Sequence, residues 1–339
     1  MRILSAVTSS YYGHSHSVEP MYVAFTEPLA RLGHTVETFD HANLLARVGE
    51  LECGERFVRA VRAGGYDLVL YQTGGKDHMI RDAISHAAAI TPILAWNSDD
   101  DWQWDSYTSQ IAPLFTHVVT TYPHIYEANR FAHRNLLLGQ WGCFERFSRF
   151  KQLKTLDFTF AGQIYKNRVP EMRYLRRSAG LEIHGLGALR VACPPLNNRR
   201  IRNFSAKILP RLNQPLSFGQ VYAIWNSSKI SYTPLGASVD PTKLQIKGRV
   251  FEMGMTGTVM LCNHNPILER YYEPGREFVS FSTLEDCAQK AKYLLQHDTL
   301  RNRIADAYYR RTKAEHLWEH RWQQIFREIG ITTVRRKVA

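Results

Sequence analysis

Long apolar runs are missing from this sequence of 339 residues: no stretch of 18 or more apolar residues occurs, so no membrane-spanning helix is expected. Cysteine is scarce, and the five present are widely scattered, without the C-x-x-C spacing of a metal or redox site. We interpret them as reduced, buried thiols of a cytoplasmic protein. The opening residues, Met1-Arg2-Ile3-Leu4, predict a strand rather than a signal peptide.

Several motifs are absent as well. Neither the phosphate loop G-x-x-x-x-G-K-[ST] nor G-x-G-x-x-G occurs, which disfavours ATP and dinucleotides as ligands. The nucleophile elbow G-x-S-x-G of serine hydrolases is also missing. His14 and His16 have a spacing that permits a metal pair, but no other residues supply the remaining ligands, so no metal is expected.

Charge is distributed unevenly along the chain. Residues 1–133 carry a net charge of −6, residues 134–211 carry +12 and residues 212–339 carry +6. A cation-rich half can bind nucleic acid, an anionic membrane surface or a phosphorylated small ligand. Composition alone leaves these three open, although no known DNA- or RNA-binding motif is present.

Strand and helix patterns alternate through both halves of the chain. The expected strands are Arg2–Val7, His34–Phe39, Tyr66–Tyr71, Pro92–Trp96, Val118–Thr121 and Asn135–Leu138, then Asp157–Ala161, Glu182–Gly185, Ile230–Thr233, Thr258–Cys262 and Phe278–Phe281. Such alternation predicts right-handed βαβ units and doubly wound parallel sheets. We therefore expect an α/β protein with two Rossmann-like domains facing across a cleft, where ligands bind outside the carboxyl ends of the strands.

The expected domains are residues 1–145 and residues 155–315, followed by residues 316–339 as a C-terminal helix and basic tail that crosses back to the first domain. Apolar residues at steps of three and four predict one amphipathic helix from Val18 to Leu32. A further helix is expected at 201–212. The stretch 187–200 is expected to be an irregular loop.

The most informative segment is Ile246 to Asn265, IKGRVFEMGMTGTVMLCNHN. It predicts a short helix opened by basic residues such as Lys247, with Arg249 and Glu252 on one face. A cation and a carboxylate side by side at a strand–turn junction suit a ligand that has both phosphate and sugar hydroxyls. The alternative is a salt bridge on a solvated helix surface.

A second candidate segment is the strand and loop FTFAGQIYKNR, residues 158–168. Gly162 permits a close backbone approach, while Lys166 and Arg168 can donate charge-assisted hydrogen bonds to a pyrophosphate. A solvated basic turn is the alternative. The strand that ends in His184-Gly185 can place an imidazole beside a base or phosphate, although ordinary turn glycines explain it equally well.

Two loops of the first half carry candidate acceptor and base residues. The loop at 8–17, TSSYYGHSHS, is rich in hydroxyls and includes His14. Asp99-Asp100-Asp101 follows the fourth strand, near three tryptophans that can cover a sugar face. His14 or Asp100 is the candidate that would deprotonate an acceptor. Capping of a helix is the alternative role for at least one of these aspartates.

These segments, in their order and spacing, resemble glycosyltransferases of the GT-B architecture. The second half, similar to the group 1 glycosyltransferases, looks most like the CgeB-like branch, whose members carry a DUF3880-type first half. The matching pieces are FTFAGQIYKNR, LEIHG, SSKISYTP, KGRVFEMGMTGTVMLCN and EPGREFVSFSTLEDCAQKAKYLL. Together with two later pieces they extend over most of residues 156–325. The first half is less similar, through LARLGHTVETFD and NSDDD.

The resemblance implies a role for each matching residue. Gly162, Lys166 and Arg168 would face the donor pyrophosphate, and Arg249 would reach a phosphate. Glu252 would hold the ribose hydroxyls. His184 and Gly185 would lie near the base. Retaining GT-B enzymes pair two glutamates eight positions apart, whereas the partner position here is Leu244, so the stereochemical outcome stays open.

We therefore expect a metal-independent glycosyltransferase that needs no cofactor and uses a nucleotide sugar of UDP, GDP or TDP. Its acceptor would be a sugar-bearing molecule, a protein or a small molecule with a hydroxyl or amine. The alternatives are a sugar-nucleotide epimerase or phosphorylase on the same frame, or a nucleic-acid-binding protein using residues 134–211. We expect no nucleic-acid partner and at most weak peripheral membrane contact.

Overall fold

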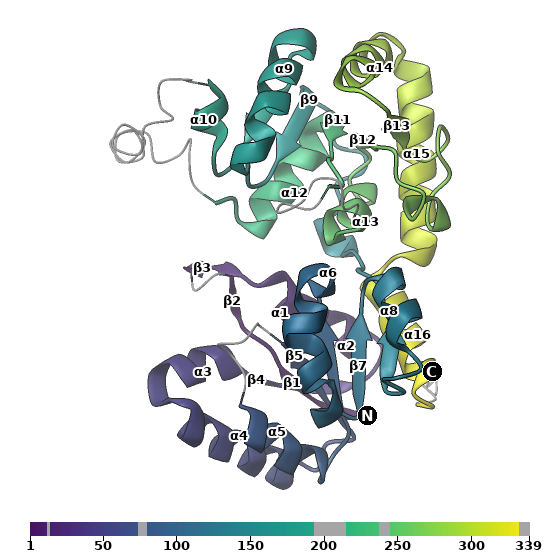
Figure 1. Ribbon diagram of the computed structural model, residues 1–339. Coiled ribbons are helices and arrows are strands. Elements are labelled where there is room, and N and C mark those ends of the chain that lie inside the picture. The colour runs from purple at the N-terminus through teal and green to yellow at the C-terminus, as the bar shows by residue number, and fades with distance from the viewer. Residues whose placement is uncertain (12–13, 74–79, 193–214, 237–244, 332–339) are drawn as a thin grey trace. The chain divides into compact units, whose positions relative to one another are not determined.

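The computed structural model describes residues 1–11, 14–73, 80–192, 215–236 and 245–331 (Figure 1). The chain forms two compact units. Unit 1 comprises Met1–Gly142 together with the segment from Trp318 onward, and unit 2 comprises Cys143–Leu317. The helix expected at 201–212 and the basic tail beyond residue 331 lie outside the described residues.

Unit 1 is built on a parallel sheet of six strands in the order β4-β1-β5-β6-β7-β8. In this order the strands are Thr35–Phe39, Arg2–Ala6, Leu68–Gln72, Ile93–Asn97, His117–Thr120 and Leu136–Leu138. Its helices are α1 (Pro20–Ala24), α2 (Glu27–Arg31), α3 (His41–Val48), α4 (Glu50–Gly64), α5 (Arg81–Ala88), α6 (Asp100–Gln103), α7 (Ser109–Ile111), α8 (Pro123–Asn129) and α16 (Trp318–Glu328).

Unit 2 contains a parallel sheet of five strands in the order β10-β9-β11-β12-β13. In this order the strands are Glu182–His184, Leu156–Ala161, Ser228–Tyr232, Val259–Asn263 and Val279–Phe281. The helices are α9 (Val169–Ala179), α10 (Ala188–Ala192), α12 (Phe218–Ser227), α13 (Gly248–Gly254), α14 (Leu284–Gln296) and α15 (Asp298–Glu315). α9 packs against α14, and α12 packs against α13 (Figure 1).

Both sheets reverse their winding direction at the same relative place. In unit 1 the chain goes from β1 outward to β4 and then returns across β1 to β5. In unit 2 it goes from β9 outward to β10 and then returns to β11. The crevice for a ligand in such a sheet lies at the carboxyl ends of the two strands that flank the reversal. The predicted α/β fold with two parallel sheets is confirmed.

The structure corrects three local predictions. The helix expected from Val18 to Leu32 is two short helices, α1 and α2, because Pro28 has no N–H with which to continue the first one. Val18 itself ends β3 (His14–Val18). β3 pairs with β2 (Ser10–Tyr11) in an antiparallel hairpin, where the sequence predicted a loop at 8–17. The expected loop at 187–200 begins with the helix α10.

The helix α16 belongs to unit 1 although it follows the whole of unit 2. Trp318 and Trp322 from this helix pack on Trp96 of β6, with ring centroids 5.4 and 5.6 Å away. The indole N–H of Trp322 donates a hydrogen bond of 2.7 Å to the carbonyl of Ala24. This helix, drawn in yellow in Figure 1, also packs against α2. The aromatic contacts therefore fix the end of the described chain to unit 1.

We expect Trp322→Ala to destabilise unit 1 by about 3–5 kcal/mol, because it empties a fully buried aromatic site. All tryptophans except Trp225 lie in unit 1, so a urea titration followed by tryptophan fluorescence reports on this unit. Leu51→Ala is the matched control, since Leu51 is 80% exposed and its loss should cost less than about 0.5 kcal/mol. Equal midpoints for the two variants would contradict the role given to Trp322.

Candidate functional site

Two glycine-containing loops meet at the carboxyl edge of the unit 2 sheet. Gly162 follows β9 with φ +146°, and Gly185 follows β10 with φ +113°. The N–H of Gly162 donates a 3.1 Å hydrogen bond to the carbonyl of His184. A Cβ atom at Gly185 would lie 2.4 Å from the carbonyl oxygen of Gly162. Only glycine at position 185 permits this approach of the two backbones.

Arg249 extends from α13 to the same place. A Cβ atom at Gly162 would lie 3.4 Å from Nη2 of Arg249, so the guanidinium faces the open side of this glycine. Lys247, half-buried, precedes the first residue of α13. Gly162 and Arg249 are therefore neighbours, and the topology explains why: both lie beside the winding reversal between β9 and β11.

Glu252 lies one turn further along α13 and is half-buried. Burial raises the pKa of its carboxyl to about 7, and the positive charge of Arg249 opposes this rise. Its negative charge contributes to the raised pKa of the buried Tyr222 hydroxyl, so these two groups lie close together. A salt bridge on a solvated surface would lower the carboxyl pKa instead. The environment of Glu252 therefore differs from that of a salt bridge on a solvated helix surface.

Arg168 and Lys166 come from the short helix η5 (Lys166–Arg168) after β9. Arg168 is 8% exposed, and its guanidinium donates a hydrogen bond to the carbonyl of Gly236, after β11. Its charge also opposes the raised pKa that burial gives Glu171. In this conformation Arg168 joins the two loops at the winding reversal. The backbone of Lys166 lies beside it, but its side chain is outside the described part of the structure.

His184 ends β10 and is half-buried beside these loops. Burial lowers the pKa of its imidazole, an effect that Glu182 opposes, so the ring is neutral at physiological pH. Among the described residues its Nε2 atom has no hydrogen-bond partner. A neutral imidazole of this kind can donate to or accept from a polar ligand edge.

In unit 1 the corresponding reversal lies between β1 and β5, and Ser9 and Asp40 lie there. The Asp40 carboxylate accepts hydrogen bonds from the backbone N–H groups of Ser9 (3.1 Å) and Asn43 (3.2 Å). Burial raises its pKa, but the hydrogen bonds from Ser9 and Asn43 outweigh burial, and the net pKa is lowered. Asp40 thus stays ionised and holds the first turn of α3.

Glu19 is a candidate that sequence reasoning missed. It precedes α1, its N–H donates a 3.1 Å hydrogen bond to the carbonyl of Ser9, and its side chain is half-buried. Burial raises the pKa of its carboxyl to about 7, opposed by the N–H of Met21. The available signal was Pro20, which commonly opens a helix and therefore placed Glu19 at a loop–helix junction. The sequence analysis instead placed Glu19 inside a helix that started at Val18, and so did not identify it as a loop residue.

The aspartates after β6 are more enclosed than expected. Asp100 is 1% exposed and accepts a 2.7 Å hydrogen bond from the hydroxyl of Thr108. Burial raises its pKa to about 6, although Thr120 and Thr108 oppose this by hydrogen bonding. Asp100 cannot touch a ligand without movement. His14 starts β3, and its side chain lies outside the described part of the structure.

The three tryptophans near these aspartates have different environments. Trp96 and Trp104 are buried in the core of unit 1, whereas Trp102 on α6 is 60% exposed. The sequence could not distinguish them, because the exposure of each ring depends on where the helix turns after β6. Only Trp102 of the three can meet a ligand in this conformation.

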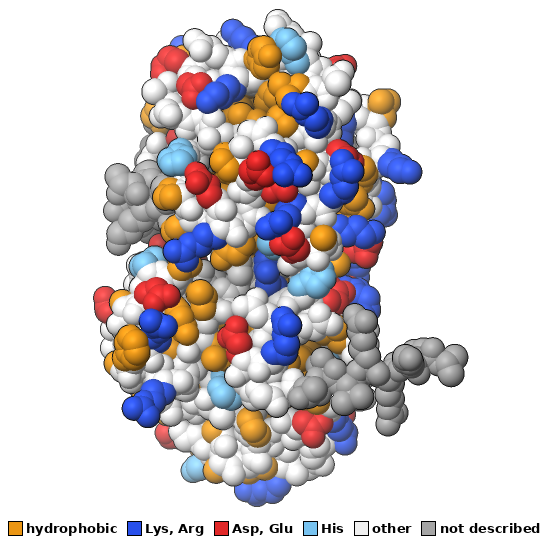
Figure 2. All heavy atoms as spheres, turned by 90° about the vertical axis from the view of Figure 1, so that its right-hand side faces the viewer, with side chains coloured by type: hydrophobic (Ala, Val, Ile, Leu, Met, Phe, Trp, Pro, Cys, Tyr) orange, Lys and Arg blue, Asp and Glu red, His pale blue; other side chains and the backbone are white. Residues whose placement is uncertain are grey.

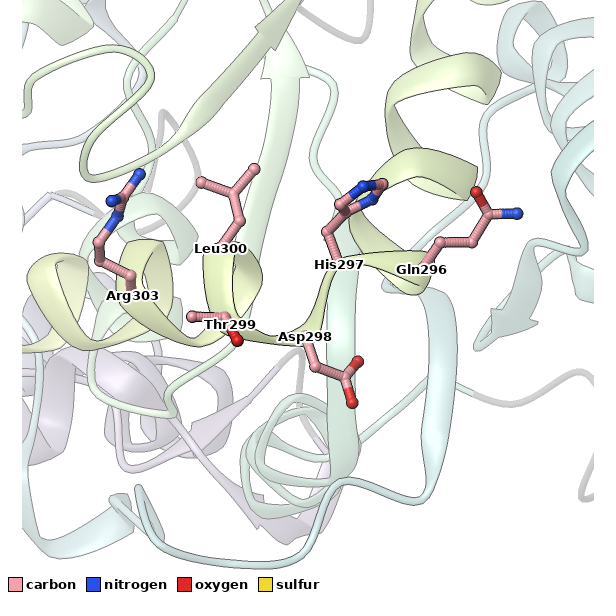
Figure 3. Close-up of a pocket in the computed structure, with 6 residues that line it drawn as sticks. All are labelled: Gln296, His297, Asp298, Thr299, Leu300 and Arg303. Atoms are coloured by element: carbon pink, nitrogen blue, oxygen red, sulfur yellow. The ribbon is translucent and has the colours of Figure 1, made fainter.

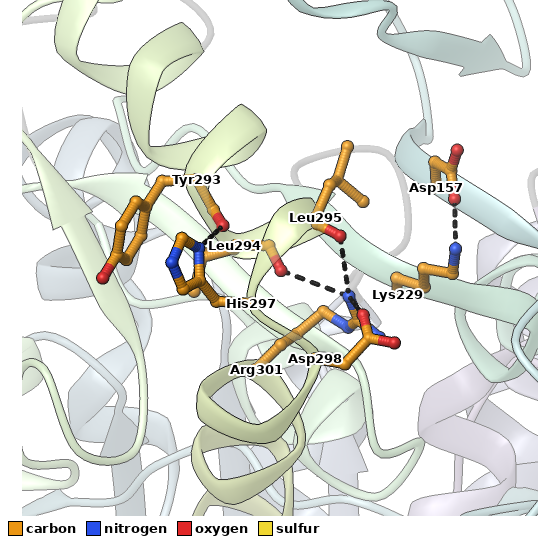
Figure 4. Close-up of polar contacts among 8 residues, drawn as sticks. All are labelled: Asp157, Lys229, Tyr293, Leu294, Leu295, His297, Asp298 and Arg301. Carbon is orange, nitrogen blue, oxygen red and sulfur yellow. Dashed lines mark hydrogen bonds and ion pairs between the residues drawn. The ribbon is translucent and has the colours of Figure 1, made fainter.

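A hollow of about 430 Å³ lies at the turn between α14 and α15 (Figure 3). Two of its polar side chains are already engaged: His297 forms a hydrogen bond of 2.7 Å with the carbonyl of Tyr293, and Asp298 pairs with Arg301 at 2.6 Å (Figure 4). α14 runs back from the carboxyl end of β13, so this turn lies toward the amino edge of the sheet. We do not assign the functional site to it.

Two features are absent among the described residues. No helix there has the length and apolarity needed to cross a bilayer. Within the same ranges, no three His, Cys, Asp or Glu side chains gather as metal ligands would.

Comparisons with known proteins give the family and the fold of this chain. A family model described as "Glycosyl transferase-like" matches residues 149–327. A glycosyltransferase from Rickettsia africae ESF-5 has a similar structure, with 12% identity, a TM-score of 0.64, and coverage of 97% of this chain and 98% of that chain. The comparison with curated proteins finds no match.

Two further solved structures share the fold. HepE from Anabaena, solved in complex with UDP, is 11% identical, with a TM-score of 0.59 over 98% of this chain and 100% of that chain. A putative UDP-N-acetylglucosamine 2-epimerase from Listeria monocytogenes is 12% identical, with a TM-score of 0.54 over 98% of this chain and 97% of that chain. At these identities the likeness shows the fold, which is the predicted GT-B architecture.

We expect Gly185→Ala to destabilise unit 2 by about 1–3 kcal/mol or more, because alanine would be strained at this positive φ and would collide with the Gly162 carbonyl. Hydrogen exchange of the β9–β13 amides, followed by mass spectrometry, measures this loss. The control is Gly180→Ala, which also has a positive φ but open space around it, and should cost about 1 kcal/mol. If both variants exchange alike, the backbone contact is unimportant.

Proposed function

Because this chain belongs to the glycosyl transferase-like family and is a glycosyltransferase with the GT-B fold, we propose that it transfers a sugar from a UDP-sugar to the hydroxyl or amine of an acceptor. The observation that carries this proposal is the placement of Arg249 and Glu252 beside Gly162 at the winding reversal of unit 2. The quoted segments of the second half further support membership of the CgeB-like branch.

The donor would lie along the carboxyl edge of the unit 2 sheet. Arg249 would bind the diphosphate, with Lys247 and Lys166 near it, and the backbone at Gly162 would admit the phosphates closely. Arg168 would keep the loops after β9 and β11 together beneath the phosphates. These cations would stabilise the negative charge that develops on the leaving UDP, so the reaction would need no metal.

Glu252 would accept hydrogen bonds from the two ribose hydroxyls. TDP, whose sugar lacks the 2′-hydroxyl, fits this pairing less well than UDP or GDP. His184 and Gly185 would border the base. The neighbour HepE, solved with UDP, supports uracil as the base over guanine.

The acceptor would bind to unit 1, where its proton must be accepted as the new bond forms. Three groups are proposed for this role: Glu19, Asp100 and His14. Glu19 is favoured, because it lies beside Ser9 at the winding reversal and is only half-buried, whereas Asp100 is enclosed and bonded to Thr108.

The fold alone does not separate a transferase from an epimerase, since the Listeria neighbour is named as an epimerase. The family match separates them in favour of transfer. A nucleic-acid-binding protein would be expected to have a continuous basic surface. On the face drawn in Figure 2, Lys and Arg side chains are instead interspersed with Asp and Glu side chains.

Donor binding can be tested at the 2′-hydroxyl, one of the two ribose hydroxyls that Glu252 would bind. We expect the wild-type protein to bind UDP roughly 10 to 100 times more tightly than 2′-deoxy-UDP, because one hydrogen bond to a charged group is lost. The Glu252→Ala variant should bind UDP more weakly than the wild-type protein does, and should bind UDP and 2′-deoxy-UDP with equal affinity. Isothermal titration calorimetry measures all four affinities.

GDP, TDP and random single-stranded DNA serve as comparison ligands in the same titrations. If neither UDP nor GDP binds, and DNA binds tightly with an affinity that falls steeply as salt is added, the transferase proposal is rejected. If UDP binds, but its affinity changes neither on loss of the 2′-hydroxyl nor in Glu252→Ala, only the role of this carboxylate is rejected.

The acid–base prediction concerns Glu19. A base must be deprotonated to act, so we expect kcat/KM to rise between pH 6 and pH 8, through the pKa of about 7 of this carboxyl. Glu19→Gln should lower kcat by roughly 100-fold or more and flatten this rise, while UDP affinity stays unchanged. UDP release from UDP-glucose with an acceptor, measured by a coupled assay, provides the rates.

Asp100→Asn and His14→Asn are the matched variants for this test. If either of them, and not Glu19→Gln, abolishes the pH dependence, the proton acceptor is that residue. Product that forms from UDP-sugar without any acceptor would instead indicate epimerisation or hydrolysis.

A further inference from the structure

Trp102 is the one exposed ring among the three tryptophans that surround the aspartates after β6. It is 60% exposed, while Trp96 and Trp104 are at most 4% exposed. Leaving a large aromatic side chain in water forgoes the free energy that its burial would supply. The position at the carboxyl end of β6, next to β5, lies on the edge where ligands of parallel sheets bind.

The local backbone explains why this ring points outward. α6 continues directly into a π-helical turn, η2 (Trp104–Thr108). The hydrogen bond from Thr108 to Asp100 joins the two ends of this segment, and Trp104 and Tyr107 fill the core beneath it. Trp102 is left on the outer side. Turns of π-helix are rare and frequently mark functional sites.

The neighbours of Trp102 are polar groups suited to hydroxyls. Asp105 and Ser106, three and four residues further along, are exposed on the same side of the helix, and Asp99 precedes α6. At the end of β6, the Nδ2 atom of Asn97 has no hydrogen-bond partner among the described residues, although Asn97 is only 3% exposed. Its Oδ1 atom bonds to Thr73 after β5. An exposed indole with carboxylates close to it along the chain, and an amide at the end of the preceding strand, matches the chemistry of a sugar ring.

We propose that Trp102 stacks on a sugar ring of the acceptor, so that the acceptor of this transferase is a glycoside whose hydroxyls bind to Asp99 and Asp105. The axial hydrogens of a pyranose form an apolar face that covers the indole, and its equatorial hydroxyls project sideways toward the carboxylates. This inference rests on the proposed function, since it identifies the chemical class of the acceptor for that reaction.

A cation would also be attracted to an aromatic ring beside carboxylates. The tested probes therefore include both classes: the methyl glycosides of glucose, galactose, mannose and N-acetylglucosamine, and choline as the cation. Saturation-transfer difference NMR and the change in tryptophan emission measure binding to the full-length chain, with UDP present and absent.

At least one methyl glycoside should bind, with saturation transferred to the hydrogens of one ring face. Trp102→Ala should weaken it roughly tenfold, and Trp102→Phe, which keeps an aromatic face, by about threefold or less. Phe131→Ala is the matched control, because Phe131 is an exposed aromatic residue of the same unit and is 80% exposed. It should leave glycoside binding unchanged. UDP affinity should stay the same in all three variants.

Several outcomes would overturn the inference. These are binding of choline but of no glycoside, glycoside binding that Trp102→Ala leaves intact, and an equal loss in Phe131→Ala. If UDP binds and no glycoside does, the acceptor class is wrong while the proposed function stands. If a glycoside binds through Trp102 and no nucleoside diphosphate binds, the proposed function fails while the sugar site is supported.

Discussion

The parallel arrangement of both sheets is the constraint on which the rest of this molecule depends. A parallel strand needs a helical crossover before the next one can start, so every loop that follows a strand emerges on one edge. The order of strands then decides which loops become neighbours. In unit 2 it brings Gly162 and Gly236, more than seventy residues apart, to the two sides of one reversal, and in unit 1 it does the same for Ser9 and Thr73.

Burial separates the roles of two arginines that look equivalent in the sequence. Arg168 is enclosed and its guanidinium satisfies a backbone carbonyl, because a buried cation needs hydrogen-bond partners. Arg249 remains half-buried and faces a glycine that offers no side chain to cover it. The same distinction applies to the carboxylates of unit 1, where Asp40 and Asp100 are bonded to neighbours and Glu19 is not fully enclosed. A buried polar side chain at the sheet edge, bonded to its neighbours, can thus support the site, whereas a half-buried one can face a ligand.

Sequence periodicity predicted both sheets, because buried parallel strands are short apolar runs whose length and spacing differ from those of helices. It also identified α13, since the placement of Arg249 and Glu252 on a short helix follows from a spacing of three. It failed where a single residue interrupts a pattern: Pro28 divides the first helix, and the hairpin around His14 follows no apolar alternation. Exposure of Trp102 and enclosure of Asp100 depend on a π-helical turn, which results from tertiary packing and has no sequence signal of its own.

The aromatic attachment of α16 makes unit 1 discontinuous, and this affects the order in which the protein can form during synthesis. The surface of Trp96 and Phe25 that receives Trp322 is complete once residues 1–142 have left the ribosome. At translation rates of about 5–20 residues per second, unit 2 then takes roughly 10–35 seconds to synthesise before α16 appears. During that interval unit 2 can fold on its own contacts, while unit 1 exposes an apolar surface. The nascent chain is therefore most vulnerable to aggregation in its first half, and chaperones would bind there.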